Sequence, residues 1–118
     1  MLTNRKLVLN TIDSIHLIQI ENILFCKSNN SYTTFYLTNQ EPIVVSRNIK
    51  EFETELIRYR FFRTHQSYLV NLMHISKIDK SDGFKLILSD NTRIPTSTRK
   101  KKTLLQILQN NQQFQNES

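Results

Sequence analysis

Short apolar segments recur about every ten residues in the first third of the chain, and this spacing restricts the fold more than any other feature. Residues 6–10, 16–19, 23–26 and 32–37 are rich in β-branched and aromatic side chains and are bounded by Asn, Asp and Ser. A crossover between parallel strands needs a dozen or more residues, and these gaps are shorter. The spacing therefore predicts antiparallel hairpins or a meander and disfavours a parallel α/β fold.

Asparagine and aspartate mark the turns of this pattern, because Gly83 is the only glycine in the chain. Both side chains tolerate left-handed backbone and can hydrogen-bond within their own turns. We expect them at the turns of residues 29–30, 39 and 90–91, and Ser81-Asp82-Gly83 is the clearest hairpin signal. Further strands are predicted at residues 43–46, 68–71, 75–79, 84–88 and 93–95.

Two segments depart from the strand pattern, and the first follows residue 46. Ser46 or Asn48 can serve as a helix N-cap, since either side chain can accept a hydrogen bond from a free amide of the first turn. The apolar residues that then share one helical face are Ile49, Phe52, Leu56 and Ile57. We predict a helix that packs this face inward and runs to about Tyr59.

The second helix is predicted to begin near Ser97 or Thr98, with an apolar stripe at Leu104, Leu105 and Leu108. Its first turn carries four cations, residues 99–102, which oppose the positive end of the helix dipole and repel one another. A bound phosphate would relieve both costs, whereas a frayed, solvated basic turn is the alternative. The polar residues 110–118 are predicted to be a disordered tail, so that residues 1–109 form one domain.

The charge balance favours a polyanionic partner. Sixteen Lys and Arg against ten Asp and Glu give a net charge of +6, and residues 91–113 carry five basic side chains and no acid. Neutralising phosphates releases counterions, which makes such binding sensitive to salt. A solvated basic face would show the same composition, so charge alone leaves the choice open.

Cysteine content and hydropathy exclude other classes of protein. Cys26 is the only cysteine, so no intrachain disulfide is possible, and the three scattered histidines offer no zinc cluster. We expect no metal and no cofactor. No apolar run approaches the roughly 18 residues that cross a bilayer, and the first residues lack the features of a signal peptide. We therefore expect a soluble, cytoplasmic domain with no membrane contact.

Two linked motifs carry a family resemblance. Residues 61–71 read FFRTHQSYLVN, which resembles the central signature of LytTR domains: an aromatic pair, Arg, any residue, His, a polar residue, Ser, an aromatic residue and Val-Asn. Residues 93–99 read RIPTSTR and resemble the late segment of that family, a short strand with Pro and Ser leading to Arg at a loop–helix junction. Order and spacing also agree, so the similarity spans roughly residues 5–109.

The resemblance implies both a fold and a function. It implies a mainly β fold, an elongated antiparallel β-sandwich with two short α-helices, which inserts loops in place of a recognition helix into successive major grooves of DNA. Such domains are output domains of bacterial response regulators in two-component systems, including those of quorum sensing. The implied function is sequence-specific binding of double-stranded promoter DNA, without enzymatic activity.

The family's base-reading positions carry over to Tyr32, Gln66 and Arg99. Glutamine can pair bidentately with adenine, and arginine with guanine, through major-groove edges. Gln66 could instead be an exposed polar loop residue, and Arg99 a phosphate contact without base reading. Tyr32 could equally pack at a strand edge, in which case Asn30 and Ser31 could take over its contact.

Phosphate contacts or positioning of the reading loops should come from residues around these three. The candidates are Lys27, Asn30, Ser31, Arg47, Asn48, Lys50, Arg63, His65, Lys100, Lys101 and Lys102. Lys50 could instead pair with Glu53 or Glu55, and Lys102 could point away from DNA. A neutral His65 can hold its loop through a backbone hydrogen bond, which we favour over direct DNA contact.

Other functions leave parts of the sequence unexplained. Catalysis would have to use residues such as Cys26, His65 and Ser67, but no nucleophile elbow, metal pair or phosphate loop accompanies them, and Cys26 is expected to be buried. A small β-domain could bind single-stranded nucleic acid by stacking on Tyr32, Phe35 and Tyr36. However, Phe35 and Tyr36 alternate to opposite faces of a strand. A protein-interaction domain with an incidental basic face is the third alternative.

Further partners follow only from the resemblance. Regulators with this output domain commonly carry an N-terminal receiver domain, which this chain lacks, so the chain could be an excised domain or a stand-alone relative. The family commonly binds paired repeats, and a second copy raises affinity through effective concentration. We expect a monomer in solution and two copies on DNA.

Overall fold

Three antiparallel sheets and two α-helices make up the fold, and together they extend over 45 × 35 × 24 Å. The computed structural model describes the backbone of residues 5–116 and the side chains of residues 5–110. Its strands are β1 (Lys6–Asn10), β2 (Ile15–Gln19), β3 (Ile23–Asn29), β4 (Tyr32–Leu37), β5 (Ile43–Val45), β6 (Phe61–His65), β7 (Tyr68–Asn71), β8 (Ile75–Asp79), β9 (Lys85–Leu88) and β10 (Arg93–Pro95). The helices are α1 (Ile49–Leu56) and α2 (Lys101–Asn116), and short 3-10 turns lie at Ile20–Asn22, Ile57–Tyr59, Leu72–His74 and Thr98–Lys100.

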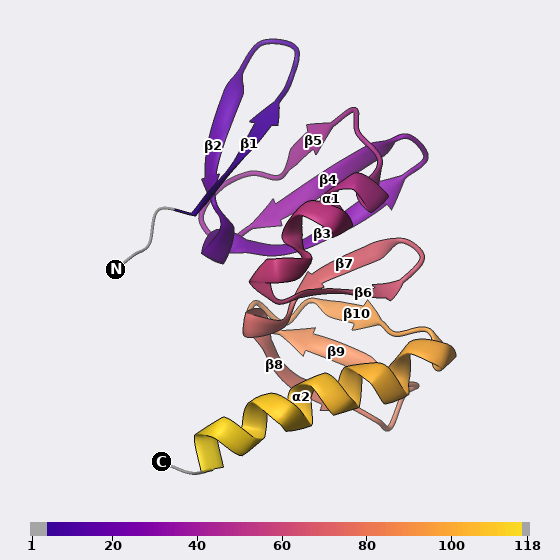
Figure 1. Cartoon of the computed structure of the whole chain (residues 1–118). Helices are drawn as coiled ribbons and strands as arrows, with labels where there is room; N and C mark the ends of the chain where they lie inside the picture. Colours follow the sequence, from indigo (N-terminus) through magenta and orange to yellow (C-terminus); the bar gives the residue numbers. More distant parts are fainter. Residues whose placement is uncertain (1–4, 117–118) are drawn as a thin grey trace.

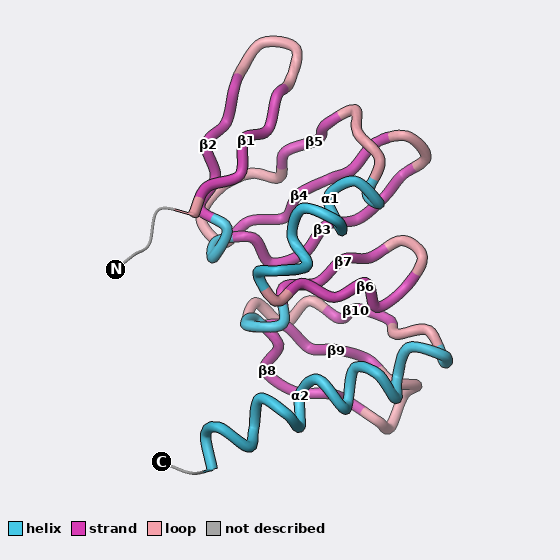
Figure 2. The backbone as a smooth tube through the Cα atoms, in the orientation of Figure 1, coloured by secondary structure: helices cyan, strands magenta, loops and turns pink. Residues whose placement is uncertain are grey.

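A five-stranded sheet with the order β5-β4-β3-β7-β6 forms the centre of the molecule (Figure 1). The β1–β2 hairpin and α1 lie on one of its faces, whereas the sheet β10-β9-β8 and α2 complete the other side. Figure 2 shows the same arrangement with the helices, strands and loops in separate colours. The predicted mainly β, antiparallel sandwich with two short helices is confirmed.

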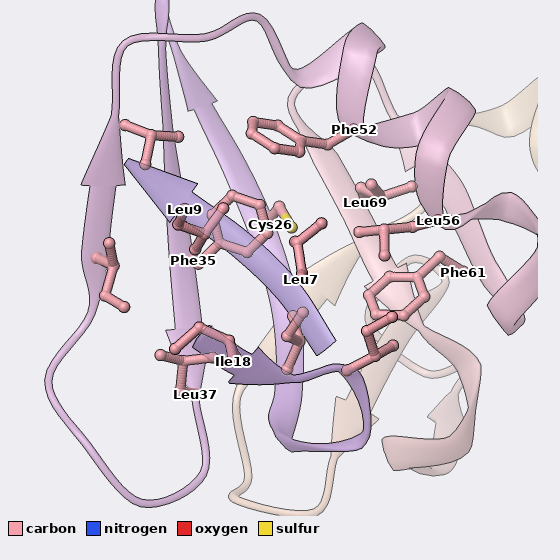
Figure 3. Close-up of a cluster of buried hydrophobic side chains, with 14 of the residues drawn as sticks. Leu7, Leu9, Ile18, Cys26, Phe35, Leu37, Phe52, Leu56, Phe61 and Leu69 are labelled. Carbon is pink, nitrogen blue, oxygen red and sulfur yellow. The ribbon is translucent and has the colours of Figure 1, made fainter. Parts of the chain in front are cut away.

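Two hydrophobic cores lie on opposite faces of the central sheet. Successive residues of β7 separate between them, because side chains alternate along a strand: Leu69 belongs to the first core and Val70 to the second. In the first core, shown in Figure 3, the rings of Phe35 and Phe52 meet edge to face with centroids 4.7 Å apart. In the second core Tyr36 stacks at 4.5 Å on Phe25. The central strands are therefore covered on both faces.

The first helix begins at the predicted cap but ends earlier than predicted. The Asn48 side chain accepts a hydrogen bond from the backbone amide of Lys50 at 2.8 Å, and Phe52 and Leu56 are buried. Ile57, which we placed on the same buried face, is 63% exposed, so that prediction is wrong. The α-helix ends at Leu56, and the tighter 3-10 turn that follows rotates Ile57 toward solvent.

The second helix begins where predicted, through a 3-10 turn at Thr98–Lys100, but extends further. α2 runs to Asn116, so residues 110–116 are helical where we predicted a disordered tail. No Gly or Pro follows Pro95, and the Gln residues of this segment are good helix formers, so nothing in the sequence ends the helix at residue 109. Residues 117–118 of the predicted tail lie outside the described residues, and the domain boundary at residue 109 remains a prediction.

Turns without glycine use asparagine, as predicted, at two positions. Asn30 and Asn91 adopt positive φ angles of 59° and 72°, and Gly83 has a φ of 71° in the β8–β9 hairpin. Asn39 is not among the described residues with positive φ, whereas Arg60, which we did not anticipate, has a φ of 70°. Its left-handed backbone ends the turn after α1 and redirects the chain into β6.

No helix in the described part of the chain combines the length and apolarity needed to cross a bilayer.

Candidate nucleic-acid interface

Three turns that were predicted to read DNA lie at one edge of the molecule. They are the β3–β4 turn at residues 29–32, the β6–β7 turn at residues 66–67, and the junction from β10 to α2 at residues 97–100. β3 ends and β7 begins at the same edge, because the two strands pair antiparallel, and Figure 1 shows all three turns at the right. We term these three segments the reading edge.

Backbone hydrogen bonds fix the three turns relative to one another. The Ser28 amide donates to the Ser67 carbonyl at 2.9 Å, which joins the β3–β4 hairpin to the β6–β7 turn. The Ser97 amide donates to the Thr64 carbonyl at 2.8 Å, which joins the start of α2 to β6. These backbone bonds join the turns directly through the main chain.

A hollow of about 480 Å³ lies between the β6–β7 turn and the start of α2. Its lining combines one acid with six polar or basic side chains of β6 and the two reading turns. The residues that line it are Glu53, Arg63, His65, Gln66, Ser97, Arg99 and Lys100. Gln66 and Arg99, predicted from positions far apart in the sequence, are therefore brought to the same surface.

Arg63 holds the β6–β7 turn in place. Its Nε donates to the His65 carbonyl at 3.1 Å, and its Nη2 donates to the Gln66 carbonyl at 2.5 Å. Its Nη1 donates to Oε1 of Glu53 on α1 at 2.7 Å, and the Arg63 side chain is only 17% exposed. One guanidinium thus connects the reading turn to the helix, because its donors are fixed in one plane.

His65 also acts within the turn. Its Nδ1 accepts a hydrogen bond from the Ser67 amide at 3.1 Å, and its ring packs against Tyr68 with centroids 5.8 Å apart. An accepting Nδ1 carries no proton, so this contact requires the neutral imidazole with its proton on Nε2. The contact is the loop-holding hydrogen bond that the sequence favoured.

The three predicted base-reading side chains all face solvent. Gln66 and Arg99 are exposed, and Tyr32 is 49% exposed rather than packed into the core. Asn30 and Ser31 beside Tyr32 are exposed too, and the left-handed backbone of Asn30 makes the tight turn that presents them.

Lysine side chains surround these turns, and three of them place the ammonium group over an aromatic ring. Nζ of Lys27 lies 5.6 Å from the ring centroid of Tyr68, and Nζ of Lys100 lies 5.4 Å from that of Phe62. Nζ of Lys101 lies 5.4 Å from the ring centroid of Phe84, and the Lys102 side chain is exposed. Such packing restricts where the ammonium groups lie while leaving hydrogen-bond donors free.

The basic residues before α1 are less available than the sequence suggested. Arg47 donates from Nε to Glu51 at 3.1 Å and from Nη2 to Glu55 at 2.5 Å, and the bond to Glu55 is the largest of the effects that raise the pKa of Arg47. Asn48 is occupied as the N-cap. The alternative in which Lys50 pairs with Glu53 or Glu55 is not formed, because Arg63 and Arg47 take these carboxylates.

Sequence reasoning missed two residues that support the reading edge. Thr33, fully buried in β4, donates from Oγ1 to the Arg47 carbonyl at 2.6 Å and so ties the start of α1 to the central sheet. Glu53 on α1 forms an ion pair with Arg63 on β6 and so supports the β6–β7 turn. A threonine at an inward position of a predicted strand is a weak signal of such a bond, whereas nothing local in the sequence links Glu53 to Arg63.

Cys26 is enclosed in the interior of the protein. Its side chain is fully buried in the first core, and burial raises the pKa of its thiol. The thiolate, which is the nucleophilic form, is thereby disfavoured. This is the buried state expected from the sequence.

A mainly β framework that gathers exposed polar turns and restrained lysines at one edge has the form of a domain that binds nucleic acid through loops. The chain belongs to the LytTR family, because the family model described as the LytTr DNA-binding domain matches residues 13–109. This is a family of DNA-binding domains of transcription factors and not of enzymes.

Curated relatives support the same family. The chain is 33% identical over 106 residues to the transcriptional regulatory protein YpdB of Escherichia coli. This match covers 81% of this chain and 43% of YpdB. It is 31% identical over 108 residues to the sensory transduction protein LytT of Oceanobacillus iheyensis. This match covers 88% of this chain and 44% of LytT. The chain thus spans less than half the length of these relatives.

A solved LytTr DNA-binding domain from Bacillus cereus shares the fold. It superimposes with a TM-score of 0.74 over 87% of this chain and 95% of that domain, at 23% sequence identity. The sequence-based identification of the family and of its fold is confirmed.

Proposed function

We propose that this chain is the output domain of a bacterial transcriptional regulator and that its reading edge recognises a specific sequence of double-stranded DNA through successive major grooves. The observation that carries the proposal is the coupling of the β6–β7 turn and the start of α2 to the same strand, β6, with Gln66 and Arg99 exposed on them. The relatives named as transcriptional regulators support the same role.

In this proposal each reading turn has a distinct task. Gln66 pairs with adenine through its amide, and Arg99 pairs with guanine through its guanidinium. Tyr32 contacts a base or a thymine methyl group from the third turn, with Asn30 and Ser31 beside it. Three separate turns suit a duplex whose major groove returns to the same face every helical turn.

The remaining predicted residues divide into phosphate contacts and positioning residues. We assign Lys27, Lys100, Lys101 and Lys102 to phosphates, because their ammonium groups have no carboxylate partner among the described residues. Arg63, His65 and Asn48 position backbone, since each makes a hydrogen bond to a backbone group of the protein. Arg47 must break its ion pairs with Glu51 and Glu55 before it can contact a phosphate. Lys50 lies exposed near Arg47 in the sequence and stays a candidate for a phosphate contact.

The lengths of the relatives support a larger regulator. YpdB and LytT are more than twice as long as the segment they share with this chain, which leaves room for a receiver domain such as those of two-component and quorum-sensing systems. We propose that the chain works with such a domain in the cytoplasm, where it meets promoter DNA, and that two copies bind paired repeats while the free domain is a monomer.

Binding of single strands by stacking is less well supported. Phe35 is fully buried in the first core, and Tyr36 stacks on Phe25 in the second core. Of the three aromatic residues considered for a stacking surface, only Tyr32 is exposed. A platform for successive bases needs more than one free ring.

The test is a fluorescence-anisotropy titration of a duplex selected from randomised sequences, compared with a scrambled duplex and with the single strand at two salt concentrations. Gln66→Ala and Arg99→Ala should each weaken binding of the selected duplex by about tenfold or more, since one bidentate base contact is worth about 1–3 kcal/mol. Binding of the scrambled duplex should change little with Gln66→Ala.

Matched controls lie elsewhere on the surface. Gln106→Ala, on the exposed side of α2, and Arg58→Ala, at the edge opposite the reading turns, should leave duplex binding unchanged. Preference for the single strand, or equal effects of the control and test variants, would contradict the proposed function.

A further inference from the structure

Three arginines gather at the edge of the molecule opposite the reading edge. Of the seven arginines in the chain, three are paired with carboxylates, namely Arg47, Arg63 and Arg93. Arg99 lies in the reading edge. The others are Arg5, Arg58 and Arg60, and no carboxylate of the described residues lies within ion-pair distance of them. Their charge is available to another molecule.

The central sheet separates these arginines from the reading turns. Arg60 directly precedes β6 at Phe61, whereas β6 ends at His65 beside the β6–β7 turn. A strand rises about 3.3 Å per residue, so the two ends of β6 lie about 13 Å apart. In Figure 1 the short turns before β3, β6 and β8 lie at the left and the reading turns at the right. A duplex on the reading edge therefore leaves the arginines uncovered.

Arg5, Arg58 and Arg60 line a hollow of about 360 Å³ together with Tyr59 and Met73. The guanidinium carbons of Arg5 and Arg58 lie 5.4 Å and 5.5 Å from the centroid of the Tyr59 ring. The ring thus holds both guanidinium groups at the hollow, where their charges attract an anion.

The side chains around the hollow resemble the centre of a protein interface. Met73 is 66% exposed, and Ile57, which lines the adjoining hollow with Arg60, is 63% exposed. Arginine, tyrosine and methionine are enriched at protein interfaces, where they contribute much of the binding energy. Glu21 is the only acid lining the hollow of the three arginines, so the surface keeps an excess of positive charge.

We propose that Arg5, Arg58, Tyr59, Arg60 and Met73, together termed the arginine edge, dock an acidic segment of a partner protein while the reading edge holds DNA. Guanidinium groups match carboxylates in a bidentate geometry, which favours glutamate and aspartate side chains. The exposed Met73 provides an apolar contact beside them, so the segment carries apolar side chains among its carboxylates. The inference goes beyond the proposed reading of DNA and has a separate readout.

The experiment measures the anisotropy of a labelled short peptide of alternating glutamate and leucine as protein is added at low salt, with and without saturating duplex. The peptide is expected to bind equally in both conditions, because the two edges are separate. Arg58→Ala should weaken its binding about tenfold, as truncating a central interface residue commonly does. A peptide with glutamine in place of every glutamate should not bind.

Lys77→Ala is the matched control, because it removes one exposed positive charge from β8 outside the hollow. It should leave peptide binding unchanged. Displacement of the peptide by duplex, absence of binding, or equal effects of Arg58→Ala and Lys77→Ala would overturn the inference. A loss of duplex affinity in Arg58→Ala would instead assign the arginine edge to DNA. Failure of the reading-edge variants Gln66→Ala and Arg99→Ala to affect duplex binding would concern only the proposed function.

Discussion

Under the proposed function, Arg63 serves DNA recognition by positioning a turn rather than by touching DNA. Its donors bond to two carbonyls of the β6–β7 turn and to Glu53, so the turn that presents Gln66 is attached to α1. Under the proposed function, the Glu53 carboxylate opposes DNA binding by its negative charge. Its presence beside the reading edge is explained by the position it gives to Arg63.

Glu53→Gln separates these two effects, because it removes the charge and keeps the size of the side chain. We expect affinity for the selected duplex to fall several-fold, since the charged bond that orders the turn is weakened. We expect affinity for a scrambled duplex to rise slightly, since one repulsive charge is gone. Anisotropy titrations of both duplexes measure the two changes.

Glu55→Gln is the control, because Glu55 pairs with Arg47 and does not contact the β6–β7 turn. It should raise affinity for both duplexes alike. The same uniform rise in Glu53→Gln would mean that Glu53 only repels phosphate and does not position the turn.

The candidate site could be predicted only in part from single residues. The two motifs located Gln66 and Arg99, and the turn chemistry of Asn30 was readable because left-handed backbone favours asparagine. The partners of Arg47 and Arg63 could not be read, because they depend on how α1 packs beside β6. Sequence proximity pointed Lys50 toward Glu53 and Glu55, whereas the fold gives both acids to arginines.

At the scale of elements, local patterns predicted most strands and both helix starts. β6 was not predicted as a strand. Phe61 lies in the first core and Phe62 packs against the second, so this strand lacks the alternation of apolar and polar residues that marks a strand with one exposed face. The end of α1 and the length of α2 were misjudged for a related reason. The apolar periodicity of the sequence continues through Ile57, although α1 ends at Leu56. The sequence becomes polar at Asn110, although α2 continues to Asn116.

The Asn48 cap gives an element-scale prediction. Asn48→Ala should lower the free energy of unfolding by about 1 kcal/mol, because an amide of the first turn of α1 loses its acceptor. Urea denaturation followed by circular dichroism measures the change. Asn39→Ala, an exposed substitution outside any helix, is the comparison and should have little effect. Equal stabilities of the two variants would show that the cap contributes nothing.

At the scale of the whole molecule, both cores use the same central sheet, so neither should persist without the other. Leu69 and Leu88 are fully buried, the first in the core with α1 and the second in the core with α2. Leu69→Ala and Leu88→Ala should each destabilise the fold by about 2–5 kcal/mol through lost burial and a cavity.

Each variant should still unfold in a single transition, with coincident midpoints in far-ultraviolet circular dichroism and in tyrosine fluorescence. A small domain with one shared sheet is expected to behave in this cooperative way. Separate transitions in either variant would show that the two cores are independent units.

The reading turns consist of residues that neither core contains, and this has a consequence for how regulators of this kind diverge. Substitutions at Tyr32, Gln66 or Arg99 leave the packed interior unchanged, because all three side chains face solvent. Under the proposed function, selection for folding and selection for target choice therefore act on different positions. After a gene duplication, one copy can acquire a new set of promoters by changes in three short turns, while the inherited scaffold continues to fold.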